Sequence, residues 1–136
     1  MVGPRVYSVE EANALVPAFE ASFTELDRLR ELLRAAKIKL TALEMIWGSS
    51  VNTKTCPDHE EGLALLEQLK ALEESFNTVL TSLAEQGAAV KDVELGLLDV
   101  YHVREGRLVQ LCWKRGEPQF LSWHHVDAGY ANRQPL

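Results

Sequence analysis

The sequence has few of the residues that typify secreted, membrane-spanning or nucleic-acid-binding proteins. Its 136 residues include two cysteines and no secretion signal, so both thiols are expected to be free rather than paired in a disulfide. No stretch approaches the roughly 20 apolar residues that cross a bilayer. Acidic residues outnumber basic ones by 20 to 14, and no basic stripe is visible for binding phosphates. These absences predict a cytoplasmic protein that binds neither nucleic acid nor membranes.

Signatures of nucleophilic catalysis and phosphate binding are also missing. Ser122 and Cys112 stand inside strand-like segments, without the sharp turn of a G-x-S-x-G motif. The glycines are scattered singly, so no glycine-rich loop opens a helix. The sequence therefore assigns no reaction and leaves open whether the protein is an enzyme.

The first third of the chain has the pattern of one long amphipathic helix. Ser8-Val9-Glu10-Glu11 matches a capping box, in which the serine and the second glutamate satisfy free amides at a helix start. Apolar residues then recur at steps of three and four as far as Trp47. Pro17 lacks a backbone donor, so a kink or restart is expected between Asn13 and Pro17.

A second helix is predicted after a loop. Residues 48–57 have no helical period and contain turn formers. A second apolar stripe then runs from Leu65 to Leu83 and stops before Gly87, a typical helix end. Two long stripes joined by one loop predict an antiparallel helical hairpin of coiled-coil type over residues 1–87.

Both helices carry more apolar residues than one seam between them would bury. The surplus residues are Leu15, Leu32, Leu63, Leu66 and Leu80. A small sheet cannot cover all of them, and large exposed apolar patches are uncommon on monomers. The sequence therefore predicts a homodimer formed mainly through the helices.

Residues 88–136 are expected to form an antiparallel sheet and a C-terminal tail. Segments 97–103, 108–114 and 119–124 have strand patterns, with turn residues between them. If both turns have two-residue loops, Val103 lies opposite Leu108 and Lys114 lies opposite Gln119, and His102 shares a face with His124. The predicted fold is a single α+β domain over 1–136, with the helical hairpin packed on a three-stranded antiparallel sheet.

Most candidate site residues lie in this C-terminal part. His124, Asp127 and Glu94 are predicted to approach one another and to offer nitrogen and oxygen ligands to a divalent metal ion. Arg133 is expected close by, either to bind an anion or to pin the tail by pairing with Asp127. Two further carboxylates, Asp99 and Glu117, complete the ligand-binding candidates. Asp99 lies within an apolar strand, so it needs a partner there, for which Arg107, Arg115 or Arg133 is available.

Several motifs resemble those of a family of small prokaryotic proteins, the domain of unknown function 2203 family. They are V-E-E-A-N-A-L-V-P, V-K-D-V-E-L-G-L-L-D-V, L-C-W-K-R-G-E-P and S-W-H-H-V-D-A-G-Y-A-N-R. Val100 and Tyr130 are mild departures from its pattern. The resemblance implies no activity. It does imply that a recurring pattern includes Asp92, Glu94, Asp99, Trp113, Gly116, Glu117, Trp123, His124, Asp127, Gly129 and Arg133.

Two functions from different classes are compatible with these features. The first is a non-enzymatic, self-associating binding or scaffold protein whose C-terminal part presents an acidic and aromatic recognition surface. The alternative is a divalent-metal-binding protein or metal-dependent enzyme that uses histidine and carboxylate residues of the C-terminal half. The metal content of the purified protein separates the two.

Overall fold

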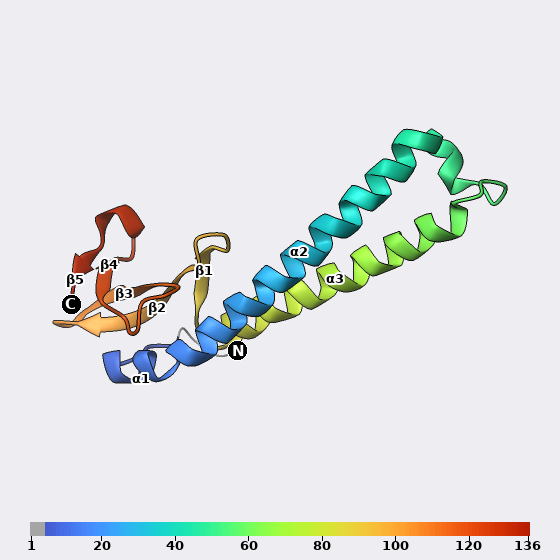
Figure 1. Ribbon diagram of the computed structural model, residues 1–136. Helices are drawn as coiled ribbons and strands as arrows, with labels where there is room; N and C mark the ends of the chain where they lie inside the picture. The colour runs from blue at the N-terminus through green and yellow to red at the C-terminus, as the bar shows by residue number, and fades with distance from the viewer. Residues whose placement is uncertain (1–4) are drawn as a thin grey trace. The chain divides into compact units, whose positions relative to one another are not determined.

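The computed structural model describes residues 5–136 and has an α+β fold (Figure 1). Its helices are α1 (Val9–Ala14), α2 (Val16–Trp47), the short 3-10 helix η1 (Gly48–Asn52), α3 (His59–Glu85) and η2 (Tyr130–Asn132). Its strands are β1 (Ala89–Asp92), β2 (Leu97–Arg104), β3 (Arg107–Lys114), β4 (Ser122–His125) and β5 (Gln134–Pro135). Among residues 5–136, no helix combines the length and apolar content that a membrane crossing requires.

The sheet is antiparallel with strand order β1-β2-β3-β4-β5, so it has five strands rather than the three predicted. The two additional strands, β1 and β5, are short edge strands. β5 consists of Gln134 and Pro135, and proline lacks the backbone donor of a regular strand. Strands of four and two residues are too short to show a period-two pattern, so the sequence does not predict them.

The register between β2 and β3 follows the two-residue turn that the sequence predicts, with Val103 opposite Leu108. The register between β3 and β4 differs from the prediction by one residue, since His125 and not His124 lies opposite Val109. The predicted two-residue turn is wrong because the chain leaves the ladder at residue 115 and rejoins it only at Ser122. Within this loop the Phe120 amide donates to Asn13 Oδ1 at 2.7 Å rather than to β3. The shift moves every side chain of β4 to the other face.

The chain divides into two compact units, and the first contains the sheet, residues up to Glu25 and residues from Val79 onward. Its helical start has the predicted capping box: the Glu11 amide donates to Ser8 Oγ at 3.1 Å, and the Ser8 amide donates to Glu11 Oε1 at 2.9 Å. The expected break is also present, since α1 ends at Ala14 and α2 begins at Val16. Pro17 then stands in the first turn of α2, where a missing donor is harmless.

The core of this first unit forms where α2 meets one face of the sheet. Trp113 of β3 is fully buried against Phe19 and Phe23, with ring centroids 6.1 and 5.9 Å away. Phe120, from the loop before β4, packs on Phe19 at 6.3 Å. Leu98, Val100, Val109 and Leu111 share the Trp113 face by strand alternation and are buried. The opposite face of the same strands is also buried, and it carries the polar residues.

The second unit, Leu26–Thr78, contains the rest of the two long helices and the loop between them. Side chains from α2, the loop and α3 share one buried cluster: Ala36, Leu43, Val51, Cys56, Leu65 and Leu69. The loop is tied to the helices by polar contacts, since Trp47 Nε1 donates to Asp58 Oδ2 at 2.8 Å. His59 Nδ1 also lies 2.8 Å from the Val51 carbonyl oxygen. These apolar and polar contacts hold residues 48–58, which have turn composition, against the ends of α2 and α3.

Candidate functional site

Three side chains of metal-ligating type meet on the polar face of the sheet. Asp99 of β2 lies opposite Cys112 of β3, and His124 of β4 lies opposite Gln110, two residues along β3. Strand alternation therefore places all three on one face. Their ligand atoms lie within 4.8 Å of one another, and the residues are 3%, 1% and 1% exposed, respectively. Among residues 5–136, this is the one group of three or more such side chains whose ligand atoms come this close.

Hydrogen bonds fix the orientation of the His124 ring. Nδ1 lies 2.8 Å from the His125 carbonyl oxygen, which can only accept, so Nδ1 carries a hydrogen. Nε2 points to Asp99 Oδ2 at 3.1 Å. An unprotonated Nε2 and an ionised Asp99 carboxylate are both acceptors and would repel each other. The His124–Asp99 pair therefore holds one further proton between these two atoms. The proton either makes His124 an imidazolium that donates to a carboxylate, or it stays on Asp99 and is donated to a neutral ring.

Cys112 is held as a neutral thiol by its surroundings. Burial, followed by the negative charge of Asp99 and a hydrogen bond to that carboxylate, raises the pKa of the Cys112 thiol to about 12. The positive charge of Arg133 opposes this effect. Without a bound cation the thiol is therefore a weak nucleophile at neutral pH, because the thiolate is the reactive form. A cysteine protease-like role is not supported by this environment.

The raised pKa of Cys112 predicts a loss of stability in alkali. A thiol with an unfolded-state pKa of 9.0 and a folded-state pKa of about 12 stays protonated longer in the native protein. The stabilisation is complete below pH 9 and declines as the pH rises from 9 towards 12. Urea denaturation of metal-free protein should show this decline, and Cys112→Ser should show a shallower one. Parallel pH profiles for the two proteins would contradict the assignment.

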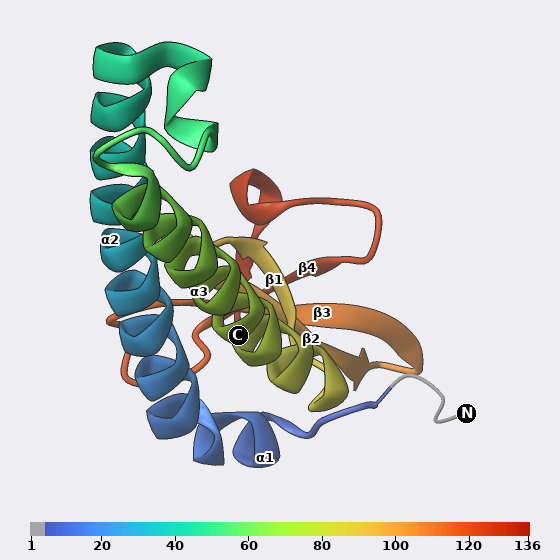
Figure 2. The ribbon, with the colours of Figure 1, turned by 90° about the vertical axis from the view of Figure 1, so that its right-hand side faces the viewer.

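The C-terminal segment contributes a second polar pair beside the cluster. Arg133 Nη1 lies 3.4 Å from Glu117 Oε2, and both charges act on Cys112. Glu117 is itself fixed, because its Oε1 accepts from the Lys114 amide at 2.8 Å. The Arg133 guanidinium lies over the Tyr130 ring of η2 at 4.3 Å. After β4 the chain loops out and folds back through the short helical turn η2 (Figure 2), and β5 then pairs with β4. This course brings the Arg133 cation near the Cys112 thiol.

Of the predicted site residues, the structure brings His124 and Asp99 together but places others elsewhere. Glu94 lies exposed in the turn before β2, and Asp127 lies exposed after β4; neither belongs to the cluster. The expected arginine partner of Asp99 is wrong, because its partner is His124. The tail-pinning partner of Arg133 is Glu117 and not Asp127. The cause is the one-residue shift of β4, which turns His124 towards Asp99.

Two residues change their assignment with this register. His102 does not share a face with His124; its Nδ1 lies 2.7 Å from the Tyr7 carbonyl oxygen, on the Trp113 side of the sheet. Cys112 was not a candidate from sequence and proves to be a member of the cluster. Because Cys112 alternates with Trp113 along β3, its thiol lies on the same face as Asp99. Only the correct β3–β4 pairing adds His124 to this face and so identifies Cys112 as a possible ligand.

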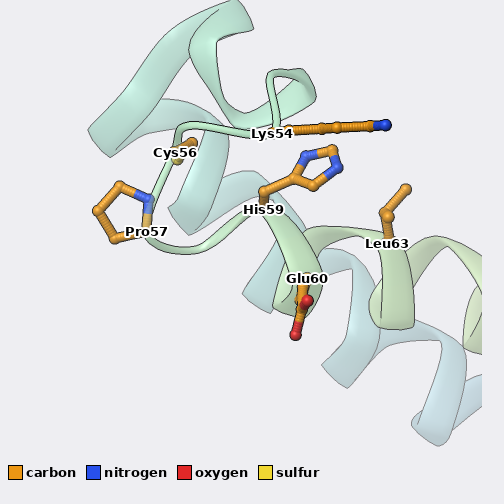
Figure 3. Close-up of a pocket in the computed structure, with 6 residues that line it drawn as sticks. All are labelled: Lys54, Cys56, Pro57, His59, Glu60 and Leu63. Carbon is orange, nitrogen blue, oxygen red and sulfur yellow. The ribbon is translucent and has the colours of Figure 1, made fainter.

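A separate hollow lies at the loop end of the second unit. It has a volume of about 500 Å³ and is lined by Lys54, Cys56, Pro57, His59, Glu60 and Leu63. Figure 3 shows that these residues come from the loop before α3 and from the first turns of that helix. His59 already binds the Val51 carbonyl through Nδ1, and Cys56 belongs to the apolar cluster of the unit. This hollow therefore offers no convergent ligand set comparable to that on the sheet.

Comparison with known proteins gives one family match. A family described as "Uncharacterized conserved protein (DUF2203)" matches residues 5–136, which confirms the resemblance noted in the sequence motifs. No curated protein and no solved structure matches the chain.

Proposed function

The chain belongs to this family of uncharacterized conserved proteins, and we propose that it is a metal-binding protein with a site for one thiophilic divalent ion. The ligands are Asp99, Cys112 and His124. The observation that carries the proposal is their convergence, from three neighbouring strands, at a place almost closed to solvent. Buried charged groups are normally paired with one another or coordinate a metal, and this set combines the oxygen, sulfur and nitrogen ligands that zinc sites use.

The orientation of the His124 ring supports this proposal. A ligating histidine usually donates its other ring N–H to a carbonyl or carboxylate, which fixes the tautomer and aims the free nitrogen at the metal. Here Nδ1–H donates to the His125 carbonyl oxygen and Nε2 is directed into the cluster. The residues thus provide both the ligand atom and the hydrogen bond that holds it.

The ligand types favour zinc over magnesium or calcium. Thiolate and imidazole suit zinc and similar transition metals, whereas magnesium and calcium prefer oxygen ligands. Binding displaces the thiol proton and the proton shared by His124 and Asp99. The two positive charges of the ion then replace those of the two protons. A coordinated thiol is deprotonated by the metal despite its high pKa in the metal-free protein. Three protein ligands leave one position of a tetrahedral zinc for water or another group.

Zinc titration of the purified protein tests the proposal. The protein should bind one zinc ion per chain, and Cys112→Ser and His124→Ala should each weaken binding by more than about a hundredfold, since even outer hydrogen-bond partners contribute ten- to hundredfold. His125→Ala is the matched control: it removes the neighbouring imidazole but keeps the carbonyl that accepts from His124.

Two further variants separate this site from the set predicted by sequence alone. Glu94→Gln and Asp127→Asn remove exposed carboxylates outside the cluster, so zinc affinity should be unchanged. Loss of binding in these variants with retention in Cys112→Ser would overturn the proposed ligand set. Absence of saturable zinc binding would reject the function.

Self-association through the helices is the second part of the proposal. Large apolar side chains are exposed on the second unit: Ile38 at 63%, Met45 at 82% and Ile46 at 69% on α2, with Leu63 and Leu66 half-exposed on α3. These residues motivate a homodimer in which coiled-coil-type packing of an antiparallel helical hairpin is extended across two copies. The cytoplasmic location stays a prediction, as does the single-domain organisation.

Light scattering tests the dimer. The protein at micromolar concentration should have twice the mass of one chain, and Ile38→Glu with Ile46→Glu should give a monomer by placing charge on the apolar surface. Leu121→Glu is the control, because it alters a similarly exposed leucine outside the two long helices. A wild-type protein with the mass of one chain would contradict the dimer and leave the metal site unaffected.

A further inference from the structure

A cavity of about 340 Å³ lies at the end of the β2–β3 hairpin, beside β4. Its lining residues are Arg104, Glu105, Arg107, Val109, Trp123 and His125. Val109 pairs with His125 and Leu111 with Trp123, so these side chains lie on the face opposite to Asp99, Cys112 and His124. The cavity is therefore distinct from the proposed metal site.

The charge of this cavity is opposite to that of the whole chain. Two arginines and a histidine line it against one glutamate, whereas the chain has a net charge of −6. Within the part of the chain that the structure describes, neither arginine has a carboxylate at ion-pair distance. Arg104 and Arg107 lie opposite each other across the hairpin, so their two positive charges repel. An anion between them would relieve this repulsion.

The arrangement of the side chains orients one of the arginines. The Arg104 guanidinium lies over the Trp123 ring at 4.9 Å, and that ring meets the His125 ring edge-on at 5.0 Å. A guanidinium held over an aromatic ring is attracted by the face of the ring and does not use its N–H donors on an acceptor there, so they can serve an oxyanion. Val109 and Trp123 add an apolar wall to the same cavity. A few charged groups beside an apolar wall, in a volume of this size, are typical of a small-molecule site.

We propose that this cavity binds a small organic anion. Its phosphate or carboxylate group is held by Arg104 and Arg107, and its apolar part lies against Val109 and Trp123. The donor fork of arginine can bind two oxygens at once, and both a carboxylate and a phosphate present two oxygens at a suitable spacing. A small molecule fits better than a nucleic acid, because the basic residues are confined to one cavity of an acidic chain.

Titration of the full chain with phenyl phosphate and with benzoate, followed by NMR, tests the proposal and separates the two anion types. The indole N–H of Trp123 is the reporter, since those of Trp47 and Trp113 donate to Asp58 and to the Glu117 carbonyl. We expect a saturable shift of the Trp123 signal with at least one of the two probes. Arg107→Gln should weaken that binding by about tenfold or more, as one charge-assisted hydrogen bond is removed.

Two controls make the test specific. Lys91→Gln removes the same charge from an exposed side chain on β1, outside the cavity, and should leave the affinity unchanged. Arg104→Gln removes the other arginine and should also weaken binding, so the test does not depend on the stability of a single variant. Inorganic phosphate should bind more weakly than phenyl phosphate, because it lacks the apolar part. No saturable Trp123 shift with either probe, or equal weakening by Lys91→Gln and Arg107→Gln, would overturn the proposal.

Discussion

Asp99→Ala is expected to lower the free energy of unfolding of the metal-free protein by about 3–5 kcal/mol, the range for removing one partner of a buried charge pair. Asp99 is buried, and its Oδ2 is the partner of His124 Nε2. Without the carboxylate, His124 Nε2 loses its buried partner and the Cys112 thiol has no acceptor. Urea denaturation near neutral pH measures the effect. Asp127→Ala, which removes an exposed carboxylate, should change it by less than about 0.5 kcal/mol.

Asp99→Asn separates a charge requirement from a hydrogen-bond requirement. The asparagine amide can donate to a neutral imidazole, so the buried pair no longer needs its additional proton. Asp99→Asn should therefore be less destabilising than Asp99→Ala, and zinc binding should be weakened in both because the amide is a poorer ligand than a carboxylate. An unchanged urea midpoint in Asp99→Ala would show that His124 and Asp99 do not stabilise each other.

Trp113→Ala should have a comparable effect, a loss of about 3–5 kcal/mol in the free energy of unfolding. Trp113 has no exposed surface and contacts Phe19 and Phe23, so alanine leaves a cavity between α2 and the sheet. Its indole Nε1 also donates to the Glu117 carbonyl at 3.0 Å, which the substitution leaves without that donor. Urea or thermal denaturation measures the change.

Trp123→Ala is the matched control for this substitution. Trp123 is partly exposed, and its contacts are the Arg104 guanidinium and the His125 ring at the surface of the sheet. Its removal should be clearly less destabilising than that of Trp113, because less apolar surface returns to water. If the two substitutions destabilise equally, the core of the first unit is not centred on Trp113.

Local features of the fold were predictable from the sequence because they depend on neighbouring residues. The capping box at Ser8 and the break before Pro17 involve residues within one or two helical turns. The β2–β3 turn has Glu105 and Gly106 at its centre, both with positive φ, which fixes the strand register. The predicted pairing of Val103 with Leu108 was therefore correct.

The pairing of β3 with β4 was not predictable in the same way. The loop from 115 to 121 takes its course from contacts with residues about one hundred positions earlier in the chain. The Phe120 amide binds Asn13, and the Gly116 amide donates to Glu20 Oε1 at 2.8 Å. Turn residues in the loop itself do not encode such partners. The edge strands β1 and β5 have too few residues for a period-two pattern to be recognised.

The candidate site shows how one such error propagates. The sequence indicates that Asp99 needs a partner and that His124 is a candidate ligand. With two-residue turns on both sides of β3, His124 would share a face with His102, and Asp127 and Glu94 would be the carboxylates within reach. One residue of shift replaces this set with Asp99 and Cys112. Correct residue types were therefore identified, while their grouping depended on a long-range contact.

X-ray absorption at the zinc edge of the zinc-loaded protein tests whether the ion binds Cys112. We expect a four-coordinate ion with one sulfur ligand at about 2.3 Å and nitrogen or oxygen ligands at about 2.0–2.2 Å. The sulfur contribution should disappear in Cys112→Ser and persist in Cys56→Ser. A shell made only of nitrogen and oxygen in the wild-type protein, or sulfur that persists without Cys112, would contradict a metal site at Asp99, Cys112 and His124.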